Sequence, residues 1–185
     1  MIKHKNYFHK LQRCKGCALK AYARNQVIGR GTIPAKLLFI GEGPGKTEDL
    51  LAEAFVGASG QLLNTLIEES AQEAETPIPS YYITNTVMCR PWIWEENDPD
   101  QGKNREPRRE EILACMLNVL HVASIVKPEF VVFVGRIAEQ AYRREFKDGI
   151  HITHPAAHLR FGGRCSPTYL LDVRNLSELF KRMYK

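Results

Sequence analysis

Lys36-Leu37-Leu38-Phe39-Ile40 runs directly into Gly41-Glu42-Gly43-Pro44-Gly45-Lys46-Thr47-Glu48-Asp49, and this junction decides how the chain folds. The apolar run is long enough for one buried strand. The loop after it is rich in glycine, which lets a backbone approach a ligand closely, and Pro44 stiffens the turn. In α/β sheets, ligands bind at the carboxyl ends of the strands. The junction therefore predicts a buried strand that ends in a ligand-binding loop.

Further strands and helices alternate along the chain. We expect strands over 81–84, 130–134 and 150–153, and helices over 60–70, 109–125, from 137 onward and over 173–183. This alternation indicates an α/β fold, here a three-layer α/β/α sandwich with a central four-stranded parallel sheet. Residues 92–105 are polar and turn-rich, which predicts an excursion on the surface. The length of 185 residues suits a single domain over 1–185.

The composition describes a mildly basic chain without a membrane-spanning stretch. Lys and Arg number 26 against 21 Asp and Glu, and the net charge of +5 suits a nucleic-acid partner but is weak support by itself. No apolar run approaches the ~20 residues that span a bilayer, so we expect no membrane partner. The N-terminus is basic but leads into no signal-peptide core, so we expect an intracellular, cytoplasmic protein.

The end of the first loop, Gly45-Lys46-Thr47, is similar to the end of a phosphate-binding P-loop. That motif needs four residues between its first glycine and the Gly-Lys pair. Here the first position falls on Ile40, and the loop carries Glu42, whose charge repels phosphate. We therefore do not expect nucleotide phosphate in this loop.

The cysteines suggest a metal centre. The chain has five, Cys14, Cys17, Cys89, Cys115 and Cys165, and an odd number without a secretory signal argues against a disulfide framework. The first two form a CxxC pair, and Cys89 and Cys115 bring the number of candidate thiolate ligands to four. Four thiolates suit zinc or an iron–sulfur cluster, and spacing does not decide between them. The alternative is four ordinary buried thiols.

Polar side chains follow three of the predicted strands. Glu42 follows the first strand, Asn85 the second and His154 the last, and Phe55 lies between the first loop and its helix. Because parallel strands bring their carboxyl ends to one edge, we expect these residues to converge on one pocket. A carboxylate, an amide, an imidazole and an aromatic face are the groups needed to hold a planar base. Separately, each has a simpler explanation: a turn residue, a satisfied polar group or a core phenylalanine.

Four motifs together resemble family 4 uracil-DNA glycosylases, the iron–sulfur members of the uracil-glycosylase superfamily. They occur in family order over nearly the whole chain: Gly41-Glu42-Gly43-Pro44-Gly45 with Glu48-Asp49; Phe55-Val56-Gly57-Ala58-Ser59-Gly60-Gln61-Leu62-Leu63; Ile83-Thr84-Asn85 with Cys89-Arg90-Pro91; and His154-Pro155-Ala156. No single motif is specific, but their combination is. The resemblance implies a monomer that excises uracil from DNA, with a structural [4Fe–4S] cluster on Cys14, Cys17, Cys89 and Cys115 and zinc as the less favoured metal.

The resemblance also implies how the base is held. A flipped uracil would stack on Phe55, Asn85 would read its pyrimidine edge, and backbone groups of Glu42 and Gly43 would contact the base. His154 would hydrogen-bond the carbonyl oxygen that gains charge as the glycosidic bond breaks. Donors aimed at such an anion lower the barrier.

The remaining implied roles concern water and DNA. A carboxylate, either Glu42 or Glu48, would position water or stabilise the cationic sugar, and we favour Glu42. The segment after the histidine motif resembles the loop that enters the duplex. Leu159 would be its wedge and Arg160 a phosphate contact.

The chain also departs from the family pattern. Gly45 offers no side chain to exclude a thymine methyl, so a 5-modified uracil is an alternative substrate. A protein of the same fold could instead trap DNA covalently, or bind DNA without catalysis. The insert over 92–103 carries Trp92 and Trp94, which either touch DNA or cover the cluster.

Overall fold

The computed structural model describes residues 11, 14, 16–94 and 102–184. Two of the sequence-based expectations concern residues outside these ranges. The basic N-terminal segment lies outside them, and so does the middle of the 92–103 insert.

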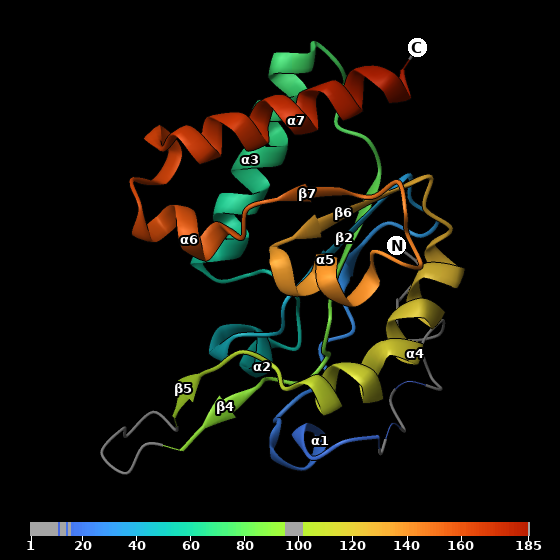
Figure 1. The fold of residues 1–185 in the computed structure, drawn as a ribbon, viewed down its shortest axis with the longest axis vertical. Helices are drawn as coiled ribbons and strands as arrows, with labels where there is room; N and C mark the ends of the chain where they lie inside the picture. The colour runs from blue at the N-terminus through green and yellow to red at the C-terminus, as the bar shows by residue number, and fades with distance from the viewer. Residues whose placement is uncertain (1–10, 12–13, 15, 95–101, 185) are drawn as a thin grey trace.

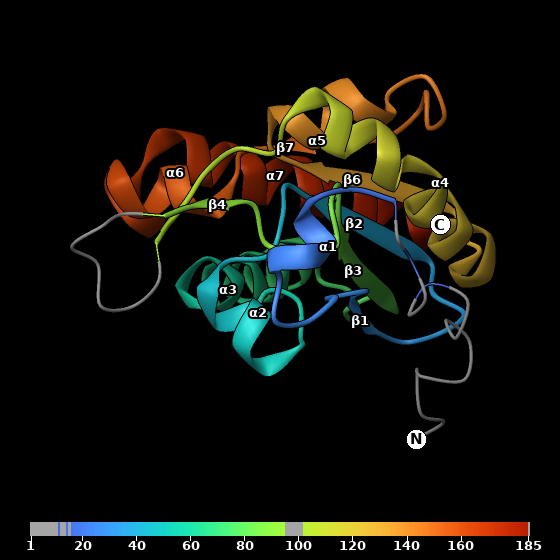
Figure 2. The ribbon, with the colours of Figure 1, turned by 90° about the horizontal axis from the view of Figure 1, so that it is seen from below.

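A five-stranded sheet occupies the centre of the molecule (Figure 1), and its strand order is β1-β3-β2-β6-β7 (Figure 2). Its strands are β1 (Arg30–Gly31), β2 (Leu37–Gly41), β3 (Tyr81–Asn85), β6 (Phe130–Val134) and β7 (Ile150–Ile152). Strands β3, β2, β6 and β7 run parallel, which confirms the predicted four-stranded parallel sheet. Strand β1 pairs antiparallel with β3 and was not predicted, because two residues are too few to give a periodic pattern.

Helices cover both faces of this sheet. They are α1 (Leu19–Tyr22), α2 (Lys46–Leu51), α3 (Ala58–Ala74), α4 (Arg109–Val126), α5 (Arg136–Tyr142), α6 (Pro155–Arg160) and α7 (Pro167–Met183), with a 3-10 turn η3 (Gly163–Cys165) before α7. An apolar core lies on each face of the sheet, and alternate residues of β2 contribute to one or the other. Leu38 and Ile40 pack with α4 and α5, whereas Leu37 and Phe39 pack with α3 and α7. Figure 2 shows α4 and α5 on one side of the strands. The three-layer sandwich is therefore as predicted.

The largest error in helix limits concerns α7, which begins at Pro167 and not near residue 173. Ser166 caps the helix, because its hydroxyl accepts a hydrogen bond from the Tyr169 N–H at 3.2 Å, and proline occupies the first turn. Serine followed by proline is a typical helix start. The pattern of apolar residues alone did not reveal it.

The polar 92–105 segment contains a short antiparallel hairpin. Its strands are β4 (Trp92–Ile93) and β5 (Lys103–Asn104), which lie apart from the central sheet (Figure 1). In the described part of the chain, no helix is both long enough and apolar enough to cross a membrane.

Candidate active site

A cavity of about 850 Å³ opens beside the carboxyl ends of the parallel strands. The structure brings most of the sequence-predicted site residues into its lining: Glu42, Gly43, Glu48, Phe55, Asn85, His154 and Arg160. Leu159 does not line the cavity but lies beside Arg160 on α6, where it is 49 % exposed. The residues singled out at three strand ends thus share one cavity.

Asn85 ends β3 and carries an unsatisfied side chain. The residue is 1 % exposed, and neither its Nδ2 nor its Oδ1 has a hydrogen-bond partner among the described residues. Buried polar groups are nearly always paired, because leaving one unpaired costs about 1–3 kcal/mol. An orphaned amide in the wall of a cavity is therefore available to a ligand that offers both a donor and an acceptor.

The ring of Phe55 lies next to this amide. Gly41 pairs in register with Asn85, and a Cβ at Gly41 would lie 2.4 Å from the Phe55 ring and 2.6 Å from Asn85 Oδ1. Only glycine therefore lets the ring and the amide approach the end of β2. The Phe55 and His154 rings are 6.4 Å apart between centroids, with their planes at 40°. An aromatic face, an amide and an imidazole accordingly lie within reach of one planar ligand.

The backbone of Phe55 is held in an unusual conformation. Its φ is +53°, in the left-handed region that non-glycine residues seldom adopt. Arg30, on the edge strand β1, donates from Nε to the Ala54 carbonyl at 2.7 Å and from Nη2 to the Phe55 carbonyl at 3.3 Å. A Cβ at Gly60 would lie 1.7 Å from the Phe55 carbonyl oxygen, so α3 can pack here only with glycine. Strain maintained by its surroundings in this way is typical of functional sites.

His154 follows β7 and caps helix α6. Its Nδ1 accepts a hydrogen bond from the Ala156 N–H at 3.2 Å, which leaves the hydrogen of the neutral ring on Nε2. Burial, together with the charges of Arg160 and His158, lowers the pKa of His154 to about 4. The imidazole is therefore neutral at pH 7 and can donate from Nε2 to a ligand.

The two carboxylates of the first loop differ in their surroundings. Burial and the charge of Glu106 raise the pKa of Glu42 to about 7, against the opposing effect of Arg160. Glu48 instead accepts hydrogen bonds from the Gly45 N–H at 3.1 Å and the Gly57 N–H at 2.7 Å. Both of its oxygens therefore hold the loops that precede α2 and α3. This difference favours Glu42 as the carboxylate available for chemistry.

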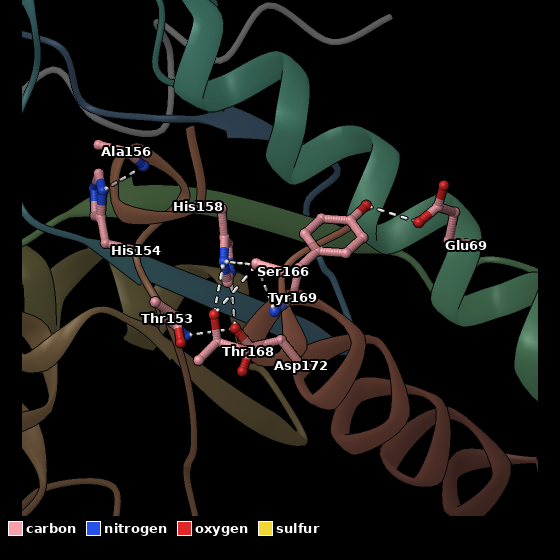
Figure 3. A network of polar contacts seen from close by, with 9 residues as sticks. All are labelled: Glu69, Thr153, His154, Ala156, His158, Ser166, Thr168, Tyr169 and Asp172. Carbon is pink, nitrogen blue, oxygen red and sulfur yellow. Dashed lines mark hydrogen bonds and ion pairs between the residues drawn. The ribbon is translucent and has the colours of Figure 1, made fainter. Parts of the chain in front are cut away.

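A buried polar network fixes the helix that carries Arg160 (Figure 3). Asp172 Oδ2, on α7, lies 2.9 Å from His158 Nε2, on α6, and accepts a hydrogen bond from the Thr153 N–H at 2.9 Å. The other ring nitrogen of His158 lies 3.4 Å from the Ser166 hydroxyl. The Asp172 carboxylate thus holds Thr153 and His158, which lie before and after His154 in the sequence. The sequence did not reveal this network, because its members are separated along the chain.

Replacing Asp172 with asparagine should lower the free energy of unfolding by about 1–3 kcal/mol. The Thr153 N–H and the His158 ring both contact Oδ2. An asparagine oxygen in that place can accept both hydrogen bonds but carries no negative charge, so both become weaker. Urea-induced unfolding measures the change. Asp148→Asn, at an exposed position, is the matched control. An equal effect of both substitutions would show that the network contributes nothing particular.

The cavity also contains residues that sequence reasoning missed. Arg136 begins α5 and lines the cavity, and so does His151 on β7. His151 Nε2 is buried without a hydrogen-bond partner among the described residues. Its place between Ile150 and Ile152 was a usable signal, since alternation along a strand puts the middle residue on the opposite face.

The four predicted ligand cysteines line a separate, small pocket. Cys14 and Cys17 precede α1, Cys89 follows β3, and Cys115 lies on α4. Asn118 Nδ2 lies 3.4 Å from the Cys14 sulfur and 3.9 Å from the Cys115 sulfur. Among the residues that the structure describes, no group of three or more His, Cys, Asp or Glu side chains is arranged to hold a metal ion. The pocket brings all four cysteines into one lining.

The fold and this cavity define a layered α/β/α protein whose ligand site is built from loops that follow parallel strands. Residues 28–176 match the model of the uracil DNA glycosylase superfamily. The chain therefore belongs to the uracil-DNA glycosylase superfamily.

Its curated relatives include type-4 uracil-DNA glycosylases. The protein from Saccharolobus solfataricus is 34 % identical over 126 residues, which cover 68 % of this chain and 52 % of the relative. The protein from Thermotoga maritima is 35 % identical over 129 residues, covering 70 % of this chain and 60 % of the relative. The protein from Pyrobaculum aerophilum is 34 % identical over 131 residues, with coverages of 71 % and 60 %. This chain thus spans about half to three fifths of the length of the relatives that it matches.

Proposed function

We propose that this protein excises uracil from DNA by hydrolysing the N-glycosidic bond, which leaves an abasic site for base excision repair. The observation that carries the proposal is the buried amide of Asn85, which has no hydrogen-bond partner in the described part of the chain and shares one cavity with Phe55 and His154. The type-4 uracil-DNA glycosylases named among its relatives support it. The protein would act inside the cell, as a monomer.

The base would be recognised by its shape and its polar edge. A uracil flipped out of the helix stacks on Phe55, and the Asn85 amide pairs with the adjacent O4 and N3–H of the ring. Backbone groups of Glu42 and Gly43 contact the base from the loop after β2. Flipping exposes these edges, and stacking between apolar groups compensates for the lost base pair.

The chemistry separates a base anion from a cationic sugar. The bond between N1 of uracil and C1′ of deoxyribose breaks, and its electron pair leaves with the base. The Nε2–H of His154 donates to the carbonyl oxygen that gains negative charge. The Glu42 carboxylate orients a water molecule, whose oxygen bonds to C1′ and whose proton the carboxylate accepts. The uracil anion then takes up a proton from solvent.

Two residues on α6 would hold the DNA around the flipped nucleotide. Arg160 lines the cavity and would contact a phosphate, whereas Leu159 is half-exposed beside it and would fill the space that the base leaves. An apolar side chain that enters the stack and a basic group on the backbone are a common combination in such proteins.

The cysteine pocket would hold a [4Fe–4S] cluster. Its donor set fits, because four thiols line one pocket and amide N–H groups of Asn118 point at two of the sulfurs. Such hydrogen bonds are typical of iron–sulfur ligation. A cluster is the preferred occupant over zinc, which four thiolates can also bind. Its contribution would be to tie the N-terminal segment to β3 and α4.

Base release from single-stranded oligonucleotides tests the proposal. Uracil, 5-hydroxymethyluracil and thymine are each placed in the same sequence, and abasic sites are measured after alkaline cleavage. We expect release of uracil, and the thymine oligonucleotide tests whether a 5-methyl group is excluded. DNA binding without base release would instead indicate a non-catalytic protein, and a DNA adduct that survives denaturation would indicate covalent trapping.

One observation favours 5-modified uracil as a second candidate substrate. A Cβ at Gly45 would lie 2.7 Å from Glu48 Oε2, so no side chain can extend from this position without displacing that carboxylate. The cavity therefore has no barrier at Gly45 to a substituent on the base. Release of 5-hydroxymethyluracil at a rate close to that of uracil would support this candidate.

The rate of excision should rise with pH between about 6 and 8. The pKa of Glu42 is raised to about 7, so the carboxylate is protonated below this pH and cannot accept a proton from water. His154, with its pKa near 4, stays neutral throughout this range. Single-turnover rates across this range measure the effect.

Two variants check the assignment of this pH dependence. Glu42→Gln should be slow and should lose the rise with pH. Glu106→Gln removes a neighbouring negative charge and should move the rise to lower pH. A profile unchanged in both variants would contradict the role of Glu42.

A further inference from the structure

A second concave surface lies on the other side of the β4–β5 hairpin from the candidate active site. This aromatic groove has a volume of about 260 Å³ and lies between α1, β4 and the start of α4. Its lining is mainly aromatic and charged: Leu19, Tyr22, Trp92, Trp94, Arg105 and Arg108, with Ala18 and Glu111.

The aromatic side chains of the groove are unusually open to solvent. Tyr22 is 69 % exposed and Trp94 is 65 % exposed. The rings of Trp92 and Trp94 lie 6.2 Å apart between centroids, and the Arg90 guanidinium lies 5.8 Å from the centroid of Trp92. Large exposed aromatic side chains gathered in one groove mark a binding surface. Their flat faces suit a planar partner.

The charge of the groove suits an anionic partner. Among the described residues that line it, Glu111 is the only acidic one, and it is paired with Arg105 through contacts of 2.6 and 2.8 Å. It also accepts a hydrogen bond from the Arg108 N–H at 2.7 Å. These interactions lower the pKa of Glu111 and keep it ionised, so its charge offsets that of Arg105. The Arg108 side chain then leaves the groove with a net positive charge.

The groove adjoins the candidate active site at Arg105. Arg105 lines both, while its neighbours Asn104 and Glu106 line the active-site cavity alone. The hairpin therefore forms a shared wall. When a DNA strand places one nucleotide in the cavity, the neighbouring nucleotides on one side would pass over this wall toward the groove.

We propose that the aromatic groove binds an unpaired nucleobase of the same DNA strand, a few nucleotides from the uracil. The base stacks on Trp94 and Tyr22, and Arg108 contacts the strand's phosphate. This inference rests on the proposed function, because it takes DNA as the ligand. Aromatic platforms beside basic side chains are how proteins hold single strands without reading their sequence.

Tryptophan fluorescence reports directly on this groove. The chain has two tryptophans, Trp92 and Trp94, and both line it. The probe is a uracil-free oligothymidylate of about ten nucleotides, within the usual site size of single-strand binders. We expect the oligonucleotide to quench the fluorescence, and a blunt duplex that contains the same strand to quench it much less. Fluorescence anisotropy of labelled DNA measures total binding in parallel.

Variants identify the stacking residues. Tyr22→Ala keeps both tryptophans and should weaken single-strand binding by about 5- to 100-fold, the usual effect of losing one stacked base. Trp94→Ala should have an effect of similar size by anisotropy. Tyr184→Ala is the matched control, since Tyr184 is also exposed but lies at the end of α7. Circular dichroism confirms that each variant is folded.

The outcomes separate this inference from the proposed function. Because the probe contains no uracil, quenching can occur whether or not the protein excises a base. DNA that binds by anisotropy without quenching would overturn the groove proposal and leave the excision proposal standing. Quenching by a proline-rich peptide but not by DNA would also overturn it, since the groove would then be a peptide site.

Discussion

Replacing His154 with alanine should slow the release of uracil by about 10²–10³-fold, the usual cost of removing one donor from a developing anion. The Nε2–H is fixed as the donor because Nδ1 already accepts the Ala156 N–H. Without this donor, the charge that forms on the base is less stabilised. Single-turnover rates at saturating enzyme measure the loss without interference from product release.

The same substitution also removes a helix cap, so the chemical effect has to be separated from a structural one. His154→Asp keeps a side-chain acceptor for α6 but lacks the donor and places a negative charge near the developing anion. It should be at least as slow as the alanine variant, with more of the stability retained. His121→Ala, on α4 and outside the cavity lining, is the control. Rates within about twofold of the parent for both His154 variants would falsify the assignment.

Replacing Cys89 with serine should remove bound iron and lower the free energy of unfolding by more than about 4 kcal/mol, as losses of structural metal centres do. The four cysteines belong to the segment before α1, the loop after β3 and the middle of α4. The proposed metal centre would connect these elements, and without it each would depend on its own apolar contacts. Iron analysis, the visible absorption spectrum and thermal unfolding of the same samples measure the effect.

Cys165→Ser is the matched control, because Cys165 is exposed and lies outside the cysteine pocket. This variant should keep its iron and its stability. Stoichiometric zinc and no iron in the parent protein would show that the pocket holds zinc and not an iron–sulfur cluster. Equal stability of both serine variants and the parent would argue for ordinary thiols.

The sequence was sufficient to predict the parallel sheet and the position of the cavity. Strands such as β2 and β6 are apolar throughout, and a short, continuous apolar run bounded by turn residues is typical of a strand that is buried on both faces. Once the strands are parallel, residues at their carboxyl ends have to share an edge. Asn85 and His154 were therefore brought together by topology, before any contact was known.

Features that depend on contacts between distant segments were not predictable in this way. The hydrogen bonds from Arg30 to the turn at Phe55 join an edge strand to a loop more than twenty residues away. The pairing of His158 with Asp172 joins two helices. The sequence favoured Glu42 over Glu48, but the physical reason came only from the folded structure, where the Gly45 and Gly57 amides occupy Glu48. In each case the information lies in the packing and not in the local pattern.

The edge strand β1 gives this protein a site that is assembled before its ligand arrives. Arg30 fastens the turn that presents the Phe55 ring, so folding itself sets the stacking surface in place and little ordering remains to be done on encounter. Free uracil should accordingly compete with DNA for the empty protein. We therefore expect a substitution of Arg30, which lies outside the cavity lining, to lower turnover while the fold is retained.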